Sequence, residues 1–316
     1  MKKILCAVLA LAAMTSCSND YTIDYNKQAI AFGEAFVDNG TRADYSTTEK
    51  ISEFKVYGTM TGNSNTVQIF NGADVTRPTD LASGVYDPTK PWLCDETQYW
   101  VPNASYEFAA IVDGVATATT GLPVTIPFTV TDGDGDLLYA TATATTDDNG
   151  TPNVDLVAFT FNHLLAKLQF NMVNRLSEGY SIKVTSLTVE NVMEDGLYTI
   201  AQSKWETTTT DKTTLTFGES DTFGLNRNSY MEEARQILPV EQTLAVTVVY
   251  DIYYDDGNGG GDQKISTATK TGEIAKTFAM NTVYDITAEI SGNEIKFTVE
   301  AVNDFNTFVQ DDLDIE

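Results

Sequence analysis

The sequence predicts an all-β protein made of two β-sandwich domains in series. Three observations support this prediction. Short runs alternate apolar with polar residues or are rich in β-branched residues. Each run is bounded by Gly, Asn, Asp or Pro. Helical periodicity is scarce along the chain. A chain of 316 residues is long enough for two ordinary domains. Many short strands separated by turns are typical of sandwiches.

The expected strands cover most of the chain beyond residue 28. They are residues 29–37, 51–59, 67–70, 106–112, 124–130, 137–145, 154–161, 167–173, 182–189, 213–217, 244–254, 264–274, 283–290 and 294–302. Residues 246–254 and 264–274 flank a glycine-rich connection, 255–262, and form an expected hairpin. Residues 231–238 favour one or two helical turns, and 162–168 fit a helix or a strand.

The domain boundary is expected near residues 162–167. This gives an N-terminal sandwich at 29–163 and a C-terminal sandwich at 164–316. No Pro- or Ser-rich linker separates the two, so we expect them to pack closely.

The N-terminus has the pattern of an export signal. Lys2 and Lys3 precede an apolar stretch, residues 4–14, that is shorter than the roughly 20 residues a membrane span needs. The sequence Met-Thr-Ser-Cys at 14–17 resembles a lipobox, the acylation signal of lipoproteins. We therefore expect a signal peptide at 1–16, lipidation (palmitate) at Cys17 and a tether at 17–28. An ordinary signal that happens to contain a cysteine is the alternative.

Charge and cysteine content exclude several classes of function. The net charge of −26 argues against nucleic acid and anionic membrane surfaces as partners. Solubility explains this acidity, and a cationic ligand is the alternative. Once Cys6 leaves with the signal and Cys17 is acylated, Cys94 alone remains, so neither an internal disulfide nor a cysteine metal site is expected.

The chain has little of the chemistry that enzymes use. His163 is the single histidine, so no His-based triad and no multi-histidine metal site can form. The sequence contains neither a G-x-S-x-G elbow nor a phosphate-binding glycine motif. Carboxylate pairs are expected by chance among 45 acidic residues. We predict no enzymatic activity and no cofactor.

Two acidic segments are candidate calcium sites. Residues 131–136, Thr-Asp-Gly-Asp-Gly-Asp, start like an EF-hand loop, but Leu137 stands at the sixth position and Thr143 at the twelfth. An acidic turn is the favoured interpretation. In the glycine-rich connection, Asp251, Asp255, Asp256 and Asp262 are the candidate ligands, and an exposed flexible loop is favoured there. A calcium-dependent adhesin stays an open alternative.

An aromatic cluster lies in residues 91–108. Trp92, Tyr99, Trp100 and Tyr106 fit the core of a sandwich or, alternatively, a platform for sugars. The second interpretation would make the protein a surface-anchored lipoprotein that binds carbohydrate.

Several stretches together resemble one family, the fimbrillins, which are lipoprotein-derived subunits of type V pili. The lipobox comes first, and the other matches are "IAFGEAF", "TRA" at 41–43, "ISEFKVYG" at 51–58, "YWVPNASYEFAA" at 99–110, "DLLYA" at 136–140, "VAFTFNHLLAKLQF" at 157–170 and "MNTVYDITAEISGNEIKFTV" at 280–299. The resemblance covers nearly the whole chain.

The resemblance implies a pilus subunit made of two transthyretin-like sandwiches at the cell outer membrane. It also implies cleavage by an arginine-specific protease in the loop after the first strand, and Arg42, before Ala43, stands where that cut is expected. Arg77 and Arg175 lie further into the expected fold. Shaft and accessory positions in the pilus are favoured, with tip and anchor positions as alternatives.

The effect of such a cut follows from strand physics. Loss of the first strand would expose an apolar groove and unpaired backbone groups, which a strand from another pilin can fill, and head-to-tail addition builds a filament. Residues 294–302 read as an integral last strand. The tail 303–316 carries Phe305, Phe308, Val309, Leu313 and Ile315 among acids and suits a detachable donor, with a frayed terminus as the alternative.

Overall fold

The computed structural model describes residues 28–37, 51–78, 91–116, 121–231, 233–255, 257, 261–292 and 294–302. These residues are almost entirely β-structure, which confirms the predicted fold class. The only helix among them is a 3-10 turn, η3 (Ile200–Gln202).

The strands are β1 (Phe32–Val37), β2 (Glu53–Gly62), β3 (Asn65–Thr76), β4 (Leu93–Cys94), β5 (Ala104–Val112), β6 (Thr125–Thr129), β7 (Leu138–Thr145), β8 (Val157–His163), β9 (Ala166–Asn174), β10 (Tyr180–Met193), β11 (Asp195–Thr199), β12 (Lys204–Thr207), β13 (Lys212–Phe217), β14 (Asn228–Tyr230), β15 (Arg235–Ile237), β16 (Glu241–Tyr254), β17 (Gln263–Thr277), β18 (Thr282–Ile290) and β19 (Ile295–Val302).

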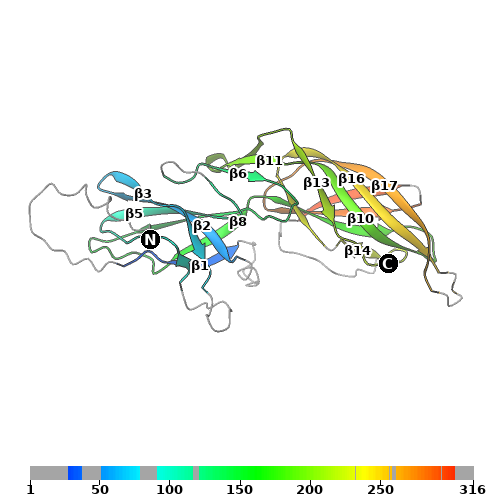
Figure 1. Ribbon diagram of the computed structural model, residues 1–316, viewed down its shortest axis with the longest axis horizontal. Helices are drawn as coiled ribbons and strands as arrows, with labels where there is room; N and C mark the ends of the chain where they lie inside the picture. The colour runs from blue at the N-terminus through cyan, green and yellow to red at the C-terminus, as the bar shows by residue number, and fades with distance from the viewer. Residues whose placement is uncertain are drawn as a thin grey trace, which may run out of the picture.

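A seven-stranded sheet forms the N-terminal half of an elongated molecule (Figure 1). Its strand order is β1-β8-β7-β5-β2-β3-β4. All neighbours in it are antiparallel except β1 and β8, which are parallel. An isolated bridge joins Phe32 in β1 to Trp92, the residue before β4. The two ends of the sheet therefore meet at β1.

Two sheets face each other in the C-terminal half. One has the order β13-β10-β16-β17, and the other the order β14-β9-β18-β19 with β15 also paired to β9. On β18, Tyr284, Ile286, Ala288 and Ile290 alternate with half-buried polar residues, so one face of the sheet points into the core. The pair of sheets is sandwich-like, as the period-2 pattern predicts.

A third, three-stranded sheet connects the two halves. Its order is β12-β11-β6, and β6 pairs antiparallel with β11 from Asp195–Thr129 to Thr199–Thr125. Figure 1 shows β6 and β11 side by side between the halves. Pro127, exposed in the edge strand β6, has no N–H to offer to a further strand. Proline there keeps this open edge from pairing with other chains.

The hydrophobic core divides into two clusters. One lies within the N-terminal half and includes Phe32, Phe54 and Phe159. The other fills the C-terminal sandwich and also includes Tyr57, Ile111, Ile126 and Leu137 from the N-terminal half. Side chains from both sequence halves are thus buried in one continuous cluster where the halves meet.

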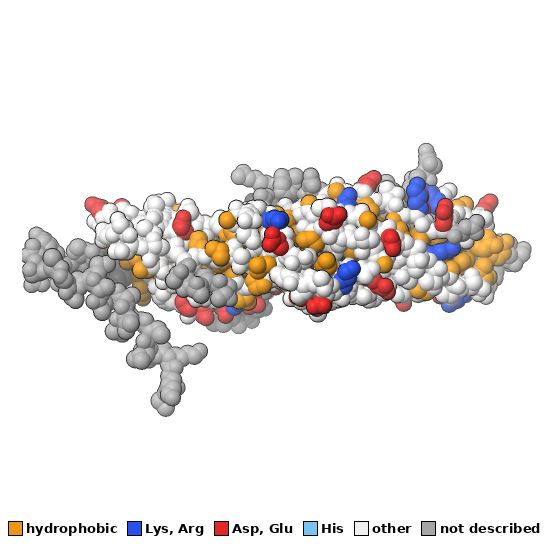
Figure 2. Space-filling view, turned by 90° about the horizontal axis from the view of Figure 1, so that it is seen from above, with side chains coloured by type: hydrophobic (Ala, Val, Ile, Leu, Met, Phe, Trp, Pro, Cys, Tyr) orange, Lys and Arg blue, Asp and Glu red, His pale blue; other side chains and the backbone are white. Residues whose placement is uncertain are grey.

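Acidic side chains are spread along the length of the surface seen in Figure 2, with Lys and Arg among them mainly on the C-terminal half. Within the described part of the chain, no helix has the length and apolar character that crossing a membrane requires.

Most sequence expectations for secondary structure agree with the strands. The expected hairpin is confirmed, because β16 and β17 pair from Glu241–Thr277 to Tyr254–Gln263. The expected helical turns at 231–238 are wrong: Arg235–Ile237 is a strand paired with β9. Around 162–168 the chain ends β8 at His163 and begins β9 at Ala166.

The division at residue 163 stays a prediction, as does the likeness to transthyretin. Residues 125–129 belong to the expected N-terminal domain by sequence, yet their strand partner β11 belongs to the expected C-terminal domain.

Candidate functional site

The candidate site is the groove that holds residues 28–37. On one side β1 runs parallel to β8, with Phe32 opposite Val157 and Val37 opposite Phe161. On the other side the residues before and within β1 bond to the segment 92–100. We call the surface formed by β8 and residues 92–100 the β1 groove.

Main-chain hydrogen bonds hold the segment along both walls of the groove. Against residues 92–100, the N–H of Trp92 donates to Phe32 O at 3.0 Å, that of Ile30 to Gln98 O at 2.8 Å and that of Trp100 to Gln28 O at 3.0 Å. Against the β8 side, Val157 N–H donates to Ala31 O at 2.9 Å. Removal of this segment would leave two rows of backbone groups without their partners, which is a template for another strand.

The side chains of the segment are integral to the N-terminal core. Phe32 is fully buried, and its ring lies 5.6 Å from Phe70 and about 6 Å from Phe54, Phe108 and Phe159, measured between centroids. Ile30 and Ala35 are also buried. Burial of one Phe side chain stabilises the folded state by about 1.5–3 kcal/mol. The groove would be strongly apolar without the segment, because aromatic rings surround the place of Phe32.

One glycine in β1 is required by close packing. A Cβ on Gly33 would lie 2.9 Å from Cβ of Leu156, which precedes β8. Because that contact atom is the first carbon of the side chain, the backbone itself would have to shift. A larger residue at this position of the groove is therefore disfavoured.

The aromatic cluster is core on the groove wall, and the sugar platform is not supported. Trp92 and Trp100 are each only 5% exposed, and Trp100 packs edge-on against Tyr106 with centroids 4.6 Å apart. Tyr106 accepts a hydrogen bond from Val101 N–H, and burial raises the pKa of its phenol. Tyr99 is exposed at 48%, but a single ring makes no platform.

The acidic turn at 131–136 joins the two halves of the chain. Arg235 of β15 bonds Asp134 with Nη1–Oδ1 at 2.5 Å, and also contacts Glu233. His163, nearly buried, lies with Nδ1 2.9 Å from Asp136 Oδ1. Asp132 accepts the N–H of Asp134. The histidine thus has a structural contact, and the acids of the turn bond protein groups.

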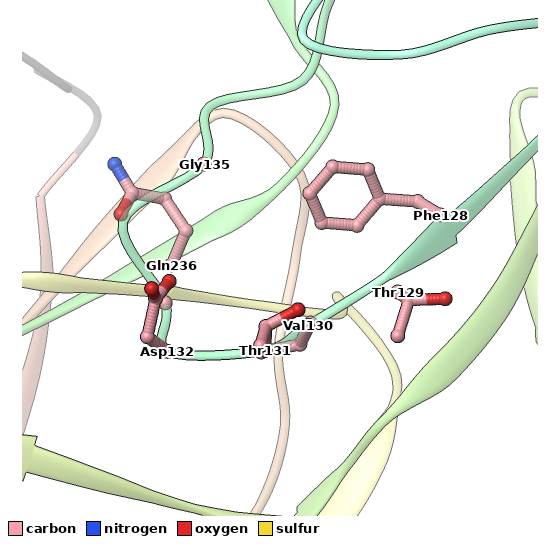
Figure 3. Close-up of a pocket in the computed structure, with 8 residues that line it drawn as sticks. Phe128, Thr129, Val130, Thr131, Asp132, Gly135 and Gln236 are labelled. Carbon is pink, nitrogen blue, oxygen red and sulfur yellow. The ribbon is translucent and has the colours of Figure 1, made fainter.

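A cavity of about 310 Å³ lies beside this turn. Figure 3 shows the ring of Phe128 on one side of it, with Asp132 and Gln236 on the other. Gln236 N–H donates to Gly133 O at 2.7 Å, which fixes the turn against β15. The described residues that line the cavity include no histidine, cysteine or lysine.

In the glycine-rich connection, the candidate calcium ligands that the structure describes also bond protein groups. Asp251 is paired with Lys264 at 2.7 Å and accepts from Thr267, Asp262 accepts from Ser181, and Asp255 accepts from Gly257 N–H. Asp256 lies outside the described residues. Across the part of the chain that is described, no three His, Cys, Asp or Glu residues are grouped as a metal site.

The predicted processing residues lie outside the described residues. These are Cys17, Arg42 and Ala43. Of the other arginines considered, Arg175 directly follows β9 and bonds Glu289 and Asn226, and Arg77 directly follows β3, where its N–H donates to Ser52 O. Cys94, half-buried in β4, has a thiol whose pKa is raised by burial.

Sequence reasoning missed the residues that shape the groove. The run "IAFGEAF" indicated a strand, but not that Phe32 would fill the centre of an aromatic core or that Gly33 would face Leu156. The glycine inside an alternating apolar run was the one available signal.

Comparison with known proteins decides the family. The model of the fimbrillin-like family matches residues 41–304, which is most of the chain and begins after β1. This chain belongs to the fimbrillin-like family. The family is one of fimbrial structural proteins, so a surface fimbrium is its expected location, and the resemblance seen in the sequence is confirmed.

Two solved structures have a similar fold. A fimbrial protein from Bacteroides vulgatus is 17% identical with a TM-score of 0.61, and the match covers 87% of this chain and 98% of that one. A candidate cell adhesion protein from Bacteroides ovatus is 12% identical with a TM-score of 0.50, covering 87% and 97%. At these identities the likeness shows the fold alone. No curated protein matches the sequence.

Proposed function

We propose that this fimbrillin is a structural, non-enzymatic subunit of a surface pilus that polymerises by strand exchange at the β1 groove. The observation that carries the proposal is the place of β1, which closes its sheet on both sides and buries Phe32 at the centre of the core. A subunit without this strand needs another strand in its place, and a neighbouring subunit can supply one.

The proposed sequence of events starts at the outer membrane. Lipid on Cys17 anchors the precursor, and an arginine-specific protease cuts between Arg42 and Ala43. The released segment takes β1 with it, and the tail 303–316 of another copy, or of a related pilin, fills the groove. Because each subunit both gives and receives a strand at different places, the contact is head-to-tail and forms a filament.

The division of the chain into two transthyretin-like sandwiches, 29–163 and 164–316, is part of this proposal. The anchored and the assembled states would then differ only in which strand occupies the N-terminal groove. Adhesion is proposed as an activity of the assembled filament.

Replacement of Arg42 tests the mechanism. Arg42→Ala should give a folded, lipidated monomer that does not polymerise when the arginine-specific protease is added, whereas the wild-type chain polymerises. N-terminal sequencing of subunits taken from filaments should begin at Ala43. Arg77→Ala is the matched control, and it should assemble as the wild type does.

Normal assembly of the Arg42→Ala chain would disprove cleavage at this residue. Filament subunits that still carry an acylated Cys17 and residues 17–42 would disprove removal of β1, and the protein would then be a permanently anchored subunit.

A further inference from the structure

The three tryptophans are equally buried but differ in hydrogen bonding. Trp92, Trp100 and Trp205 are each 5% exposed. The indole N–H of Trp205 donates to Leu164 O at 2.7 Å. Among the described residues, the indole N–H groups of Trp92 and Trp100 have no acceptor. Buried donors without acceptors are rare in native proteins, and each needs an explanation such as strain, a function or a bound water.

Both unpartnered tryptophans are on the same wall of the β1 groove. The main chain of Trp92 bonds to Phe32 and that of Trp100 to Gln28, so they hold the segment at two points. The ring of Trp92 packs on Phe54, 5.3 Å between centroids, and that of Trp100 on Phe108 at 6.3 Å. Phe54 and Phe108 both contact Phe32.

The resident segment does not provide an acceptor to either indole N–H. Residues 29–33 are Ala, Ile, Ala, Phe and Gly, none of which has a side-chain oxygen, and the residue before them, Gln28, is exposed. Their main-chain carbonyls at Ala31 and Phe32 already accept the N–H groups of Val157 and Trp92. The groove therefore fits the apolar side chains of β1, but its two indole N–H groups have no acceptor on the segment.

We propose that Trp92 and Trp100 are specificity residues of the groove, whose indole N–H groups bond oxygen-bearing side chains of an incoming donor strand. This rests on the proposed strand exchange and adds the chemistry of the donor: an extended segment that combines aromatic residues with Asn, Asp, Thr or Gln. Residues 303–316 of a second copy, Asn-Asp-Phe-Asn-Thr-Phe-Val-Gln-Asp-Asp-Leu-Asp-Ile-Glu, have this composition.

A thermodynamic direction follows from the mismatch. A donor strand that satisfies both indoles gains two buried hydrogen bonds that β1 does not make, while the apolar burial stays similar. The resident strand serves as a placeholder that keeps the core closed, and its replacement is favourable once the cut releases it.

Three single substitutions test this in the full-length chain. Trp92→Phe and Trp100→Phe remove the unpartnered donors and keep an aromatic ring. The melting temperature of the uncut chain should stay within a few degrees of wild type or rise. Trp205→Phe removes a donor that is satisfied and should lower the melting temperature clearly more.

For binding of the donor peptide, we expect the substitutions at Trp92 and Trp100 to have the larger effect and the substitution at Trp205 to have none. After cleavage with the arginine-specific protease, a labelled synthetic peptide of residues 303–316 should bind to the Trp92→Phe and Trp100→Phe chains at least fivefold more weakly than to wild type. Trp205→Phe, assayed below its melting temperature, should bind the peptide as wild type does. A peptide with Asn, Asp, Thr and Gln replaced by Ala should bind weakly and equally to wild type and to the two groove variants.

The hydrogen-bond-sensitive indole Raman band supplies a readout independent of folding. The uncut chain should show two weakly bonded indoles and one strongly bonded indole, and the peptide complex or polymer should show three strongly bonded ones. Three strongly bonded indoles in the uncut chain would mean that water satisfies them and would overturn the inference.

The remaining outcomes separate the two proposals. If the cut chain polymerises and binds the peptide with no dependence on Trp92, Trp100 or the acceptor side chains, the specificity inference is wrong and strand exchange stands. If the cut chain neither polymerises nor binds the peptide, both are wrong.

Discussion

The first and the last strand of the described chain are held in opposite ways. β1 is short but lies between β8 and Trp92, with its Phe32 and Ala35 buried, as is Ile30 just before it. β19 is longer, pairs along its length with β18, and its inward residues Ile295, Phe297 and Val299 are only half-buried. Loss of β1 would expose the interior of the N-terminal core. Loss of β19 would expose only the periphery of the C-terminal core. The comparison teaches that the burial of a strand's side chains, and not the length of the strand, decides how much the core depends on it.

Truncation of Phe32 is the largest effect expected from this comparison. Phe32→Ala removes a fully buried ring that contacts four other Phe rings and should cost about 3–5 kcal/mol in the free energy of unfolding. Phe297→Ala, at a half-buried ring in β19, should cost roughly half as much or less. Denaturant titration of both variants measures this, and equal losses would refute the contrast.

Overpacking at the β19 margin should have an intermediate effect. A Cβ on Gly272 of β17 would lie 2.5 Å from Cε2 of Phe297, so Gly272→Ala must displace that ring. We expect a loss of about 1–3 kcal/mol. In the double variant Gly272→Ala, Phe297→Leu, the added methyl group should cost clearly less, because the ring it meets is gone. Additive losses in a thermal double-mutant cycle would exclude the contact as the cause.

The smallest effect is expected at Asp285 of β18, beside β19. Burial raises the pKa of this carboxyl above 3.8, and Tyr230 OH donates to its Oδ2 at 3.2 Å. Because the native state binds the proton more tightly than the unfolded chain, Asp285 lowers stability above its raised pKa, and this loss disappears as the pH falls toward 3.8.

Asp285→Asn should therefore raise the melting temperature slightly at pH 7 and have little effect near pH 3. Melting curves over this range check the sign. Asp211→Asn is the control, at an exposed carboxylate, and should show no such trend. A destabilised Asp285→Asn protein at pH 7 would contradict the role of burial.

The sequence predicted the long strands because their period-2 patterns survive any tertiary arrangement. It missed β4, β11, β12, β14 and β15, which have two to five residues each and are too short to show a clear period-2 pattern. Three of them, β11, β14 and β15, also pair with strands far away in the chain. The helix expected at 231–238 failed for a related reason. The helix-forming run around Arg235 is overridden by pairing with β9 and by the contact with Asp134.

The candidate site was predictable as a strand but not as a groove. Alternation in "IAFGEAF" identified the first strand, while parallel pairing with β8, more than a hundred residues away, has no local signal. Whether the indole N–H groups of Trp92 and Trp100 are hydrogen-bonded depends on which acceptors lie nearby in the fold, and the composition of the sequence does not contain that information. Burial explains why Trp92 and Trp100 fit the core interpretation.

The small sheet of β6, β11 and β12 has a consequence for how the protein is made. When synthesis has reached residue 163, β6 is complete, but the strand that pairs with it, residues 195–199, has yet to be made. Ile126, buried in the finished protein, must wait for the same residues, because Tyr198 stands opposite it. The N-terminal half therefore cannot complete its folding until residues 195–199 of the C-terminal half have been synthesised. A chain that ends at residue 163 would leave β6 without its partner strand.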